Sequence, residues 1–174
     1  MNANNIDYLY VGCNEDLFKP IRVEKRESKF TVFWYGAANL LQGVDVILRS
    51  AKLLEKNKNI QFRLVGPIRK KYSGLIKNLK LKDIEFIDFI PYNKLPIEIN
   101  KADLCLGGHF SNKDKAKRVI PGKTFQFVSC NRPTIVADNL ANRELFRETK
   151  HLSFIEPDSP QKLASKILEI KNGR

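Results

Sequence analysis

Short apolar segments alternate with amphipathic segments along most of the chain, and this alternation restricts the fold more than any other feature. Six apolar runs are predicted as strands, at 30–35, 60–65, 84–89, 102–106, 133–137 and 152–155. Helical spacing of apolar residues predicts helices at 44–54, 72–79, 94–101, 124–130, 142–148 and 160–170. Continuous apolar strands separated by helices are typical of a parallel sheet covered on both faces. The sequence therefore predicts an α/β fold, a single-domain, Rossmann-like doubly wound parallel sheet.

Three segments that follow predicted strands carry suggestive chemistry, because a doubly wound sheet binds its ligand beyond the carboxyl ends of its strands. They are 36–43, 107–123 and 137–144. In the first, Gly36, Ala37 and Ala38 are small enough for backbone amides to approach a phosphate near a helix N-terminus. No G-x-G-x-x-G follows the first strand, which weakens a dinucleotide hypothesis and leaves a mononucleotide one open.

The charge is strongly positive and unevenly spread. The net charge of +12 favours anionic partners such as nucleotides, nucleic acid or acidic lipid. Between Lys52 and Lys82 stand ten Lys or Arg and one acid, a pattern usual for solvated helix faces. A second cluster falls in the expected loop before residue 124: Lys113, Lys115, Lys117, Arg118 and Lys123.

Several classes of protein are disfavoured. Cys13, Cys105 and Cys130 form no C-x-x-C pair, so neither a disulfide framework nor a zinc site is expected. No Ser-His-Asp or Cys-His set is evident, and neither is a nucleic-acid-binding motif. No apolar run reaches the length of a membrane span, and the first residues do not resemble a signal peptide. A cytoplasmic location is expected, with peripheral contact at the inner face of the membrane as a further expectation.

Five segments resemble, in order, the C-terminal half of the family-four (group 1) GT-B glycosyltransferases. They are VGCNEDLFKP, YGAANLLQGVDVIL, FRLVGP, the stretch from LKLKDIEF to ADLCL, and IPGKTFQFVSCNRPTIVADNLANREL. The resemblance implies a retaining, metal-independent enzyme with no cofactor, whose C-terminal domain holds a nucleotide-diphosphate sugar. It implies that residues 1–20 form an interdomain linker and 21–174 the donor-binding domain. A separate N-terminal acceptor domain, in cis or in trans, is the implied partner, without which the chain is expected to be inactive.

The family's donor residues carry over only in part. In the family a basic pair binds the diphosphate, and here Ala38 and Gln42 stand near the positions of that pair. The family also has two glutamates spaced eight residues apart, and their positions are occupied here by Arg118 and Gln126. The pattern KAKRVIPGK at 115–123 resembles a subset associated with cell-surface polysaccharide synthesis. In that subset the basic residues move to this second loop, which makes Lys117, Arg118 and Lys123 the phosphate candidates.

Four further positions complete the expected site. Gln126 is expected to hydrogen-bond a ribose hydroxyl, and Ile90 to contact the base through its backbone. Glu144 falls on the position of the family's later glutamate, and His109 is expected to contact the sugar. No catalytic residue and no metal ligand is assigned. Two alternatives stay open: a degenerate nucleotide-binding module that no longer turns over, and a basic nucleic-acid-binding domain.

Overall fold

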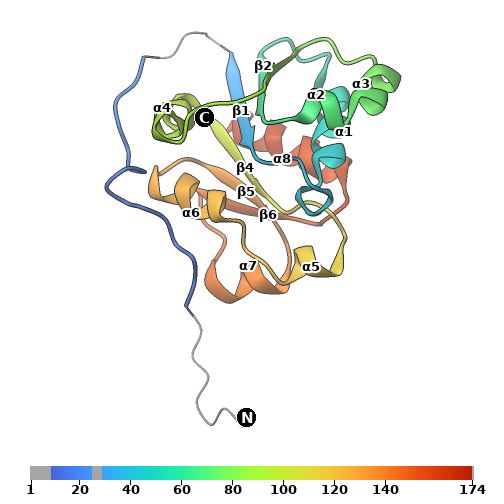
Figure 1. Cartoon of the computed structure of the whole chain (residues 1–174). Helices are drawn as coiled ribbons and strands as arrows, with labels where there is room; N and C mark the ends of the chain where they lie inside the picture. Colours follow the sequence, from blue (N-terminus) through green and yellow to red (C-terminus); the bar gives the residue numbers. More distant parts are fainter. Residues whose placement is uncertain (1–8, 25–28, 174) are drawn as a thin grey trace.

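The computed structural model describes residues 9–24 and 29–173 and contains one six-stranded sheet (Figure 1). The strand order is β3-β2-β1-β4-β5-β6, and all neighbouring strands are parallel. The strands are β1 (Phe30–Tyr35), β2 (Ile60–Val65), β3 (Ile84–Ile87), β4 (Leu104–Gly108), β5 (Thr134–Ala137) and β6 (Leu152–Ile155). The predicted doubly wound α/β fold is confirmed.

Helices cover both faces of the sheet. The longer ones are α1 (Val44–Leu54), α3 (Ser73–Leu79), α4 (Leu95–Lys101), α6 (Gly122–Ser129) and α8 (Pro160–Asn172). The shorter ones are η1 (Leu40–Gln42), α2 (Ile68–Lys71), η2 (Tyr92–Lys94), α5 (Asp114–Lys117) and α7 (Leu140–Leu145). Within the described part of the chain, no helix combines the length and apolar character that crossing a bilayer requires.

The side chains of β1 show why apolar runs in this chain form central strands. Val32 and Trp34 belong to a core that includes residues of α1 and α8, whereas Phe33 belongs to a second core that includes residues of α4 and α6. All three are fully buried. Successive strand residues point to opposite faces, so a strand buried on both sides must be apolar at every position.

Several predicted boundaries are wrong. The strand expected at 84–89 ends at Ile87, and the helix expected at 72–79 begins at Ser73, because Tyr72 leaves helical geometry with φ −120° and ψ 22°. The strand expected at 102–106 occupies Leu104–Gly108, and α6 begins at Gly122 instead of 124. A short helix, α5, lies inside the segment expected to be a loop.

Gly107 stands in β4 at a position where a side chain would not fit. A Cβ at Gly107 would lie 2.9 Å from Thr124 Oγ1 and 2.9 Å from Val136 Cγ1. The close contact of β4 with α6 and β5 therefore depends on glycine.

Residues before β1 are held against the domain. Phe18 is fully buried in the core beneath α4 and α6, and its carbonyl accepts a hydrogen bond from Ser129 Oγ at 2.5 Å. Asn100 donates to the Lys19 carbonyl at 3.0 Å and accepts from the Ile21 amide at 3.1 Å. Residues 18–21, on both sides of the boundary predicted at residue 20, are thus attached to this domain. Residues 1–8 of the predicted linker lie outside the described residues.

Candidate functional site

The order of strands reverses between β1 and β4, and this reversal fixes where a ligand can enter. β1 pairs with β2 on one side and with β4 on the other, through Val32–Leu104 and Phe33–Cys105. The connections from β1 and β4 therefore leave in opposite directions, which opens a crevice at their carboxyl ends. The segments after Tyr35 and after Gly108 border this point.

The two segments touch each other. Ser111 Oγ donates to the Leu41 carbonyl at 2.8 Å, and the Phe110 amide donates to the Gln42 carbonyl at 3.4 Å. Gly43 has φ 63°, and a Cβ there would lie 2.6 Å from the Phe110 carbonyl carbon. Glycine at this position allows both the left-handed turn and the close approach of the loop after β4.

Lys123 lies at the centre of this region, in a place that the sequence did not predict. It was expected in an exposed basic loop; instead it stands in the first turn of α6 and is only 6% exposed. Its ammonium lies 4.4 Å from the centre of the Trp34 ring, and Nζ has no hydrogen-bond partner. A Cβ on Gly108 would be 3.7 Å from both Lys123 Nζ and the Gln42 carbonyl oxygen. The end of β4 thus lies close to both the first loop and the start of α6.

Burial controls the electrostatics of Lys123 and His109. Loss of water lowers the pKa of Lys123 to about 7, because the charged ammonium is the form that burial penalises. The face of the Trp34 ring offsets part of that cost. Burial, and then the charge of Lys123, lower the pKa of His109 to about 4, although a hydrogen bond with the Val119 backbone opposes the shift. His109 is therefore neutral near pH 7, whereas Lys123 is divided between its charged and neutral forms.

Gln126 lies one turn after Lys123 on α6 and is 8% exposed. Its Nε2 donates to the Tyr92 hydroxyl at 3.4 Å, whereas its Oε1 is buried without a partner. Tyr92 follows Ile90 in the segment after β3, and its ring meets Phe18 edge to face with 5.3 Å between centroids. The segment after β3 thus reaches the face of α6 that carries the amide.

The other predicted residues lie on the margin of this region or outside it. Ala38 is buried and has φ 51°, so only its backbone is available to a ligand. Arg118 follows α5 and is exposed, as is Glu144 on α7. Contacts join the loop after β1, the end of β4 and Lys123, whereas Arg118 and Glu144 take no part in these contacts.

Buried polar atoms without hydrogen bonds gather around the same point. Such an atom costs about 1–3 kcal/mol, so proteins pair nearly all of their buried polar atoms. Among the described residues, five of them belong to side chains of the strand ends, the first loop and α6: Trp34 Nε1, Gln42 Oε1, His109 Nδ1, Lys123 Nζ and Gln126 Oε1. This set contains donors and acceptors, as a polar ligand would require.

Sequence reasoning missed Trp34 and Lys71. Trp34 is the chain's single tryptophan at the end of an apolar strand, which indicates a core position but not a partner for a cation. Lys71 ends α2, and its ammonium donates to the Ala37 carbonyl at 2.8 Å. No local pattern could connect residues 34 positions apart.

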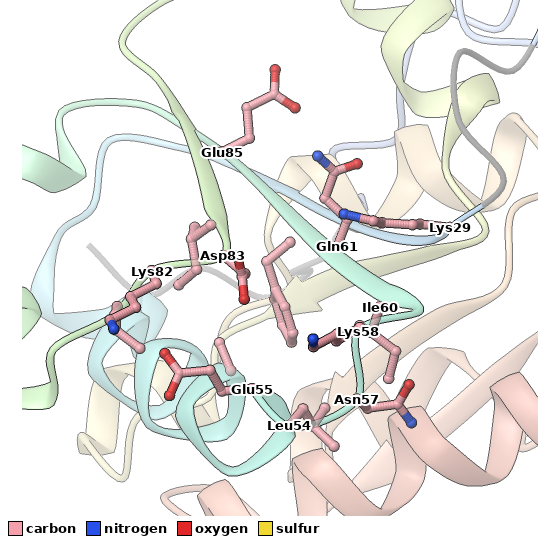
Figure 2. Close-up of a pocket in the computed structure, with 14 residues that line it drawn as sticks. Lys29, Leu54, Glu55, Asn57, Lys58, Ile60, Gln61, Lys82, Asp83 and Glu85 are labelled. Atoms are coloured by element: carbon pink, nitrogen blue, oxygen red, sulfur yellow. The ribbon is translucent and has the colours of Figure 1, made fainter.

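A well-formed cavity of about 680 Å³ lies elsewhere, at the amino-terminal edge of β2 and β3. Figure 2 shows charged side chains around it, with Glu55, Lys58 and Asp83 among them. Another cavity, of about 470 Å³, lies at the carboxyl edge of the sheet, beyond β5 and β6, and has Lys117, Asn139 and Arg143 in its wall. Of the residues proposed for the donor site, Lys117 lines the cavity at the carboxyl edge, and the others line neither cavity. In residues 9–24 and 29–173, no three His, Cys, Asp or Glu side chains are grouped to hold a metal ion.

A doubly wound parallel domain with a buried, unpaired cation at its topological switch point has the features of a nucleotide-binding α/β domain. Residues 17–174 match the sequence model of the family described as glycosyl transferases group 1. The chain belongs to that family, as the five motifs predicted. No curated protein sequence matches the chain.

Solved structures of glycosyltransferases share the fold. The chain superposes on sucrose-phosphate synthase from Thermosynechococcus elongatus with a TM-score of 0.71 and 17% identity, over 92% of this chain and 42% of that one. The C-terminal domain of LpcC, a group 1 glycosyl transferase from Francisella tularensis, superposes with a TM-score of 0.71 and 17% identity, over 92% of this chain and 88% of that one. HepE from Anabaena, solved with UDP and glucose, superposes with a TM-score of 0.70 and 19% identity, over 91% of this chain and 45% of that one.

These coverages agree with a C-terminal half of a GT-B enzyme. The chain spans less than half of sucrose-phosphate synthase and of HepE, but most of a structure that is itself a C-terminal domain. The identities are low, so the likeness establishes the fold. Together with the family match, it identifies the chain as a glycosyltransferase domain.

Proposed function

We propose that this domain holds the nucleotide-diphosphate sugar of a retaining, metal-independent glycosyltransferase that acts in cell-surface polysaccharide or glycan synthesis. The single observation that supports the donor site best is Lys123, a buried cation without a partner at the switch point. HepE was solved with UDP-glucose and TarM with UDP, and both share this fold. The polysaccharide role rests on the KAKRVIPGK resemblance alone.

The chemistry follows from the charge that develops on the leaving group. When the bond from the anomeric carbon to the phosphate breaks, the diphosphate gains negative charge that must be stabilised. Lys123 supplies a cation, and the N-cap of α6, Pro121, makes no side-chain capping bond, so the N-terminus of α6 favours an anion. Arg118 adds an exposed cation that can close over the phosphates. These groups stabilise the diphosphate without a metal ion.

The remaining contacts would position the nucleoside and the sugar. Gln126 would bond a ribose hydroxyl through its free Oε1, and the backbone near Ile90 would meet the base. His109, neutral near pH 7, would offer its free Nδ1 to a sugar hydroxyl, and Glu144 would face the sugar when the cleft closes. The amides of Gly36, Ala37 and Ala38 would complete the phosphate contacts.

An acceptor domain is the proposed partner of the carboxyl edge of the sheet. Among the described residues, five large hydrophobic side chains in the segments that follow strands stay exposed: Leu40, Phe89, Tyr92, Val119 and Leu140. Large exposed apolar groups at one edge are typical of an interaction surface. Peripheral contact with a membrane is a weaker proposal, based on the net charge of +12.

A thermal-shift panel of UDP-, GDP-, ADP- and dTDP-sugars tests the donor site. One nucleotide class is expected to raise the melting temperature, because a ligand that binds only the folded state stabilises it. A panel with no shift at millimolar ligand would argue against the donor site. Binding of RNA or DNA that weakens steeply with salt, in filter assays, would favour the nucleic-acid alternative instead.

The purified chain alone is expected to bind donor without transferring sugar, because transfer requires an acceptor held beside the anomeric carbon. The measurement is release of nucleoside diphosphate in the presence of candidate acceptors. Robust turnover by the 174 residues would contradict the proposal. The uncharged Gln126 and the first loop without cations favour one second candidate, a module that binds without turnover. It predicts no transfer even when a matching acceptor domain is supplied.

Donor affinity is expected to fall as the pH rises from 7 to 9. Lys123 titrates near pH 7 in the empty domain, and a bound diphosphate must raise its pKa, so binding takes up a proton above pH 7. The loss should approach tenfold per pH unit, which is the limit for one proton. Calorimetry in two buffers of different ionisation enthalpy measures the uptake. Lys123→Met should bind with no proton uptake, and uptake that persists in this variant would assign the proton to another group.

A further inference from the structure

Lys71 brings a positive charge to the loop after β1 from a different part of the chain. It is the last residue of α2, and its Nζ donates to the Ala37 carbonyl at 2.8 Å. Ala37 lies between Gly36 and Ala38, the residues whose amides form one side of the proposed donor site. The cation is therefore held at the backbone that a diphosphate would approach.

Two features of the fold place α2 beside this loop. A Cβ on Gly66 would lie 2.0 Å from the Gly36 carbonyl oxygen, so glycine lets the end of β2 press against the end of β1. Tyr72, directly after Lys71, packs against the larger core, and burial together with the Asp45 carboxylate raises the pKa of its hydroxyl. Asp45 lies in the first turn of α1, so the end of α2 is anchored next to the start of α1.

The loop itself offers no cation. From Gly36 to Leu48 the sequence contains no Lys, Arg or His. Backbone amides alone would leave the charge of a diphosphate poorly balanced on this side, because Lys123 lies on the other side, in α6. Among the described residues, Lys71 has no carboxylate within 4 Å that would neutralise it.

The neighbouring cations of α2 are less well placed. Arg69 lies over the Phe86 ring at 5.5 Å from its centre, which directs it toward β3. Lys70 is exposed and, among the described residues, makes no hydrogen bond to the loop. Of the three basic residues that end α2, Lys71 is the one bonded to the proposed site.

We propose that Lys71 is a donor-binding residue that contacts the diphosphate from the side of the first loop, opposite Lys123. The inference rests on the proposed function. In the empty domain the Ala37 carbonyl holds the ammonium in place. When a nucleotide-diphosphate sugar binds, the ammonium has further N–H donors free for a phosphate oxygen, because an ammonium carries three.

The test compares Lys71→Ala with Lys70→Ala, a matched change of one exposed lysine on the same helix. The probe is the nucleotide-diphosphate sugar that gives the largest shift in the thermal panel. Lys71→Ala is expected to weaken its binding about five- to tenfold at low salt, as an exposed cation facing a charged ligand should. Lys70→Ala should stay within about twofold. Raising the salt from 50 to 300 mM should shrink the Lys71 effect, since exposed charges are screened.

The free nucleoside and Lys123→Met separate the outcomes. Lys71→Ala should bind the nucleoside like the parent and melt at the parent's temperature, which a purely structural role would not allow. One outcome is that the parent binds donor, that Lys123→Met weakens this binding, and that Lys71→Ala does not. In that case the Lys71 inference is wrong and the proposed function stands. Equal losses for Lys70→Ala and Lys71→Ala would also overturn it, as a general charge effect. A parent that binds no donor would overturn both.

Discussion

Lys123→Met is expected to weaken binding of a nucleotide-diphosphate sugar by about 1.5–3 kcal/mol, the usual range for a hydrogen bond to a charged group. The effect should be large because the ammonium is 6% exposed and salt can hardly screen it. Isothermal titration calorimetry measures the loss. Binding of the free nucleoside should change little, because it carries no phosphate for Lys123 to meet.

The same variant should not lose stability. In the empty domain the ammonium is buried without a hydrogen bond, and methionine fills a similar volume without that desolvation cost. Loss of the contact with Trp34 offsets only part of the gain. We therefore expect a melting temperature equal to or above the parent's, with binding lost. Arg118→Ala, at an exposed site, should show a smaller and salt-dependent loss. A Lys123→Met protein that melts lower and binds donor normally would make Lys123 a structural residue.

Gly66→Ala should destabilise the domain by about 3–5 kcal/mol. Gly66 has φ 129°, which L-residues rarely adopt, and the new Cβ would collide with the Gly36 carbonyl oxygen at 2.0 Å. The clash is with backbone, so no rotation of a side chain can relieve it. Chemical denaturation followed by circular dichroism gives the free energy of unfolding.

Gly74→Ala is the matched control for that variant. Gly74 lies in α3, and a Cβ there meets nothing within 4 Å. Because alanine favours a helix over glycine, this change should stabilise the domain by up to about 1 kcal/mol. Similar effects of the two substitutions would show that the close approach of β2 to β1 is not under strain at Gly66.

The sequence predicted the fold well because the fold depends on local patterns. The strands at 30–35, 60–65 and 152–155 have the predicted bounds, since each is an apolar run with a clear stop. The end of β4 was misplaced because Gly107 normally indicates a turn. Here glycine is required because Thr124 and Val136, which lie far away in sequence, pack too closely for a side chain at this position.

The candidate site was less predictable because its contacts join distant residues. Lys123 looked like a member of an exposed basic loop, and only the packing of α6 on the end of β1 brings it over Trp34. Gln126 and Tyr92 meet from α6 and the segment after β3. The binding roles of Arg118, Ile90 and Glu144, like the absence of a metal ion, stay predictions that the ligand experiments address.

The strand order has a consequence for how the domain assembles during synthesis. Strands β2 and β3 extend the sheet from one edge of β1, and β4, β5 and β6 then extend it from the opposite edge. Each strand that leaves the ribosome therefore finds a free edge of the strands already made, and none has to insert between two partners. Domains fold progressively from the N-terminus during translation, so this order allows the sheet to grow without breaking any pair already formed.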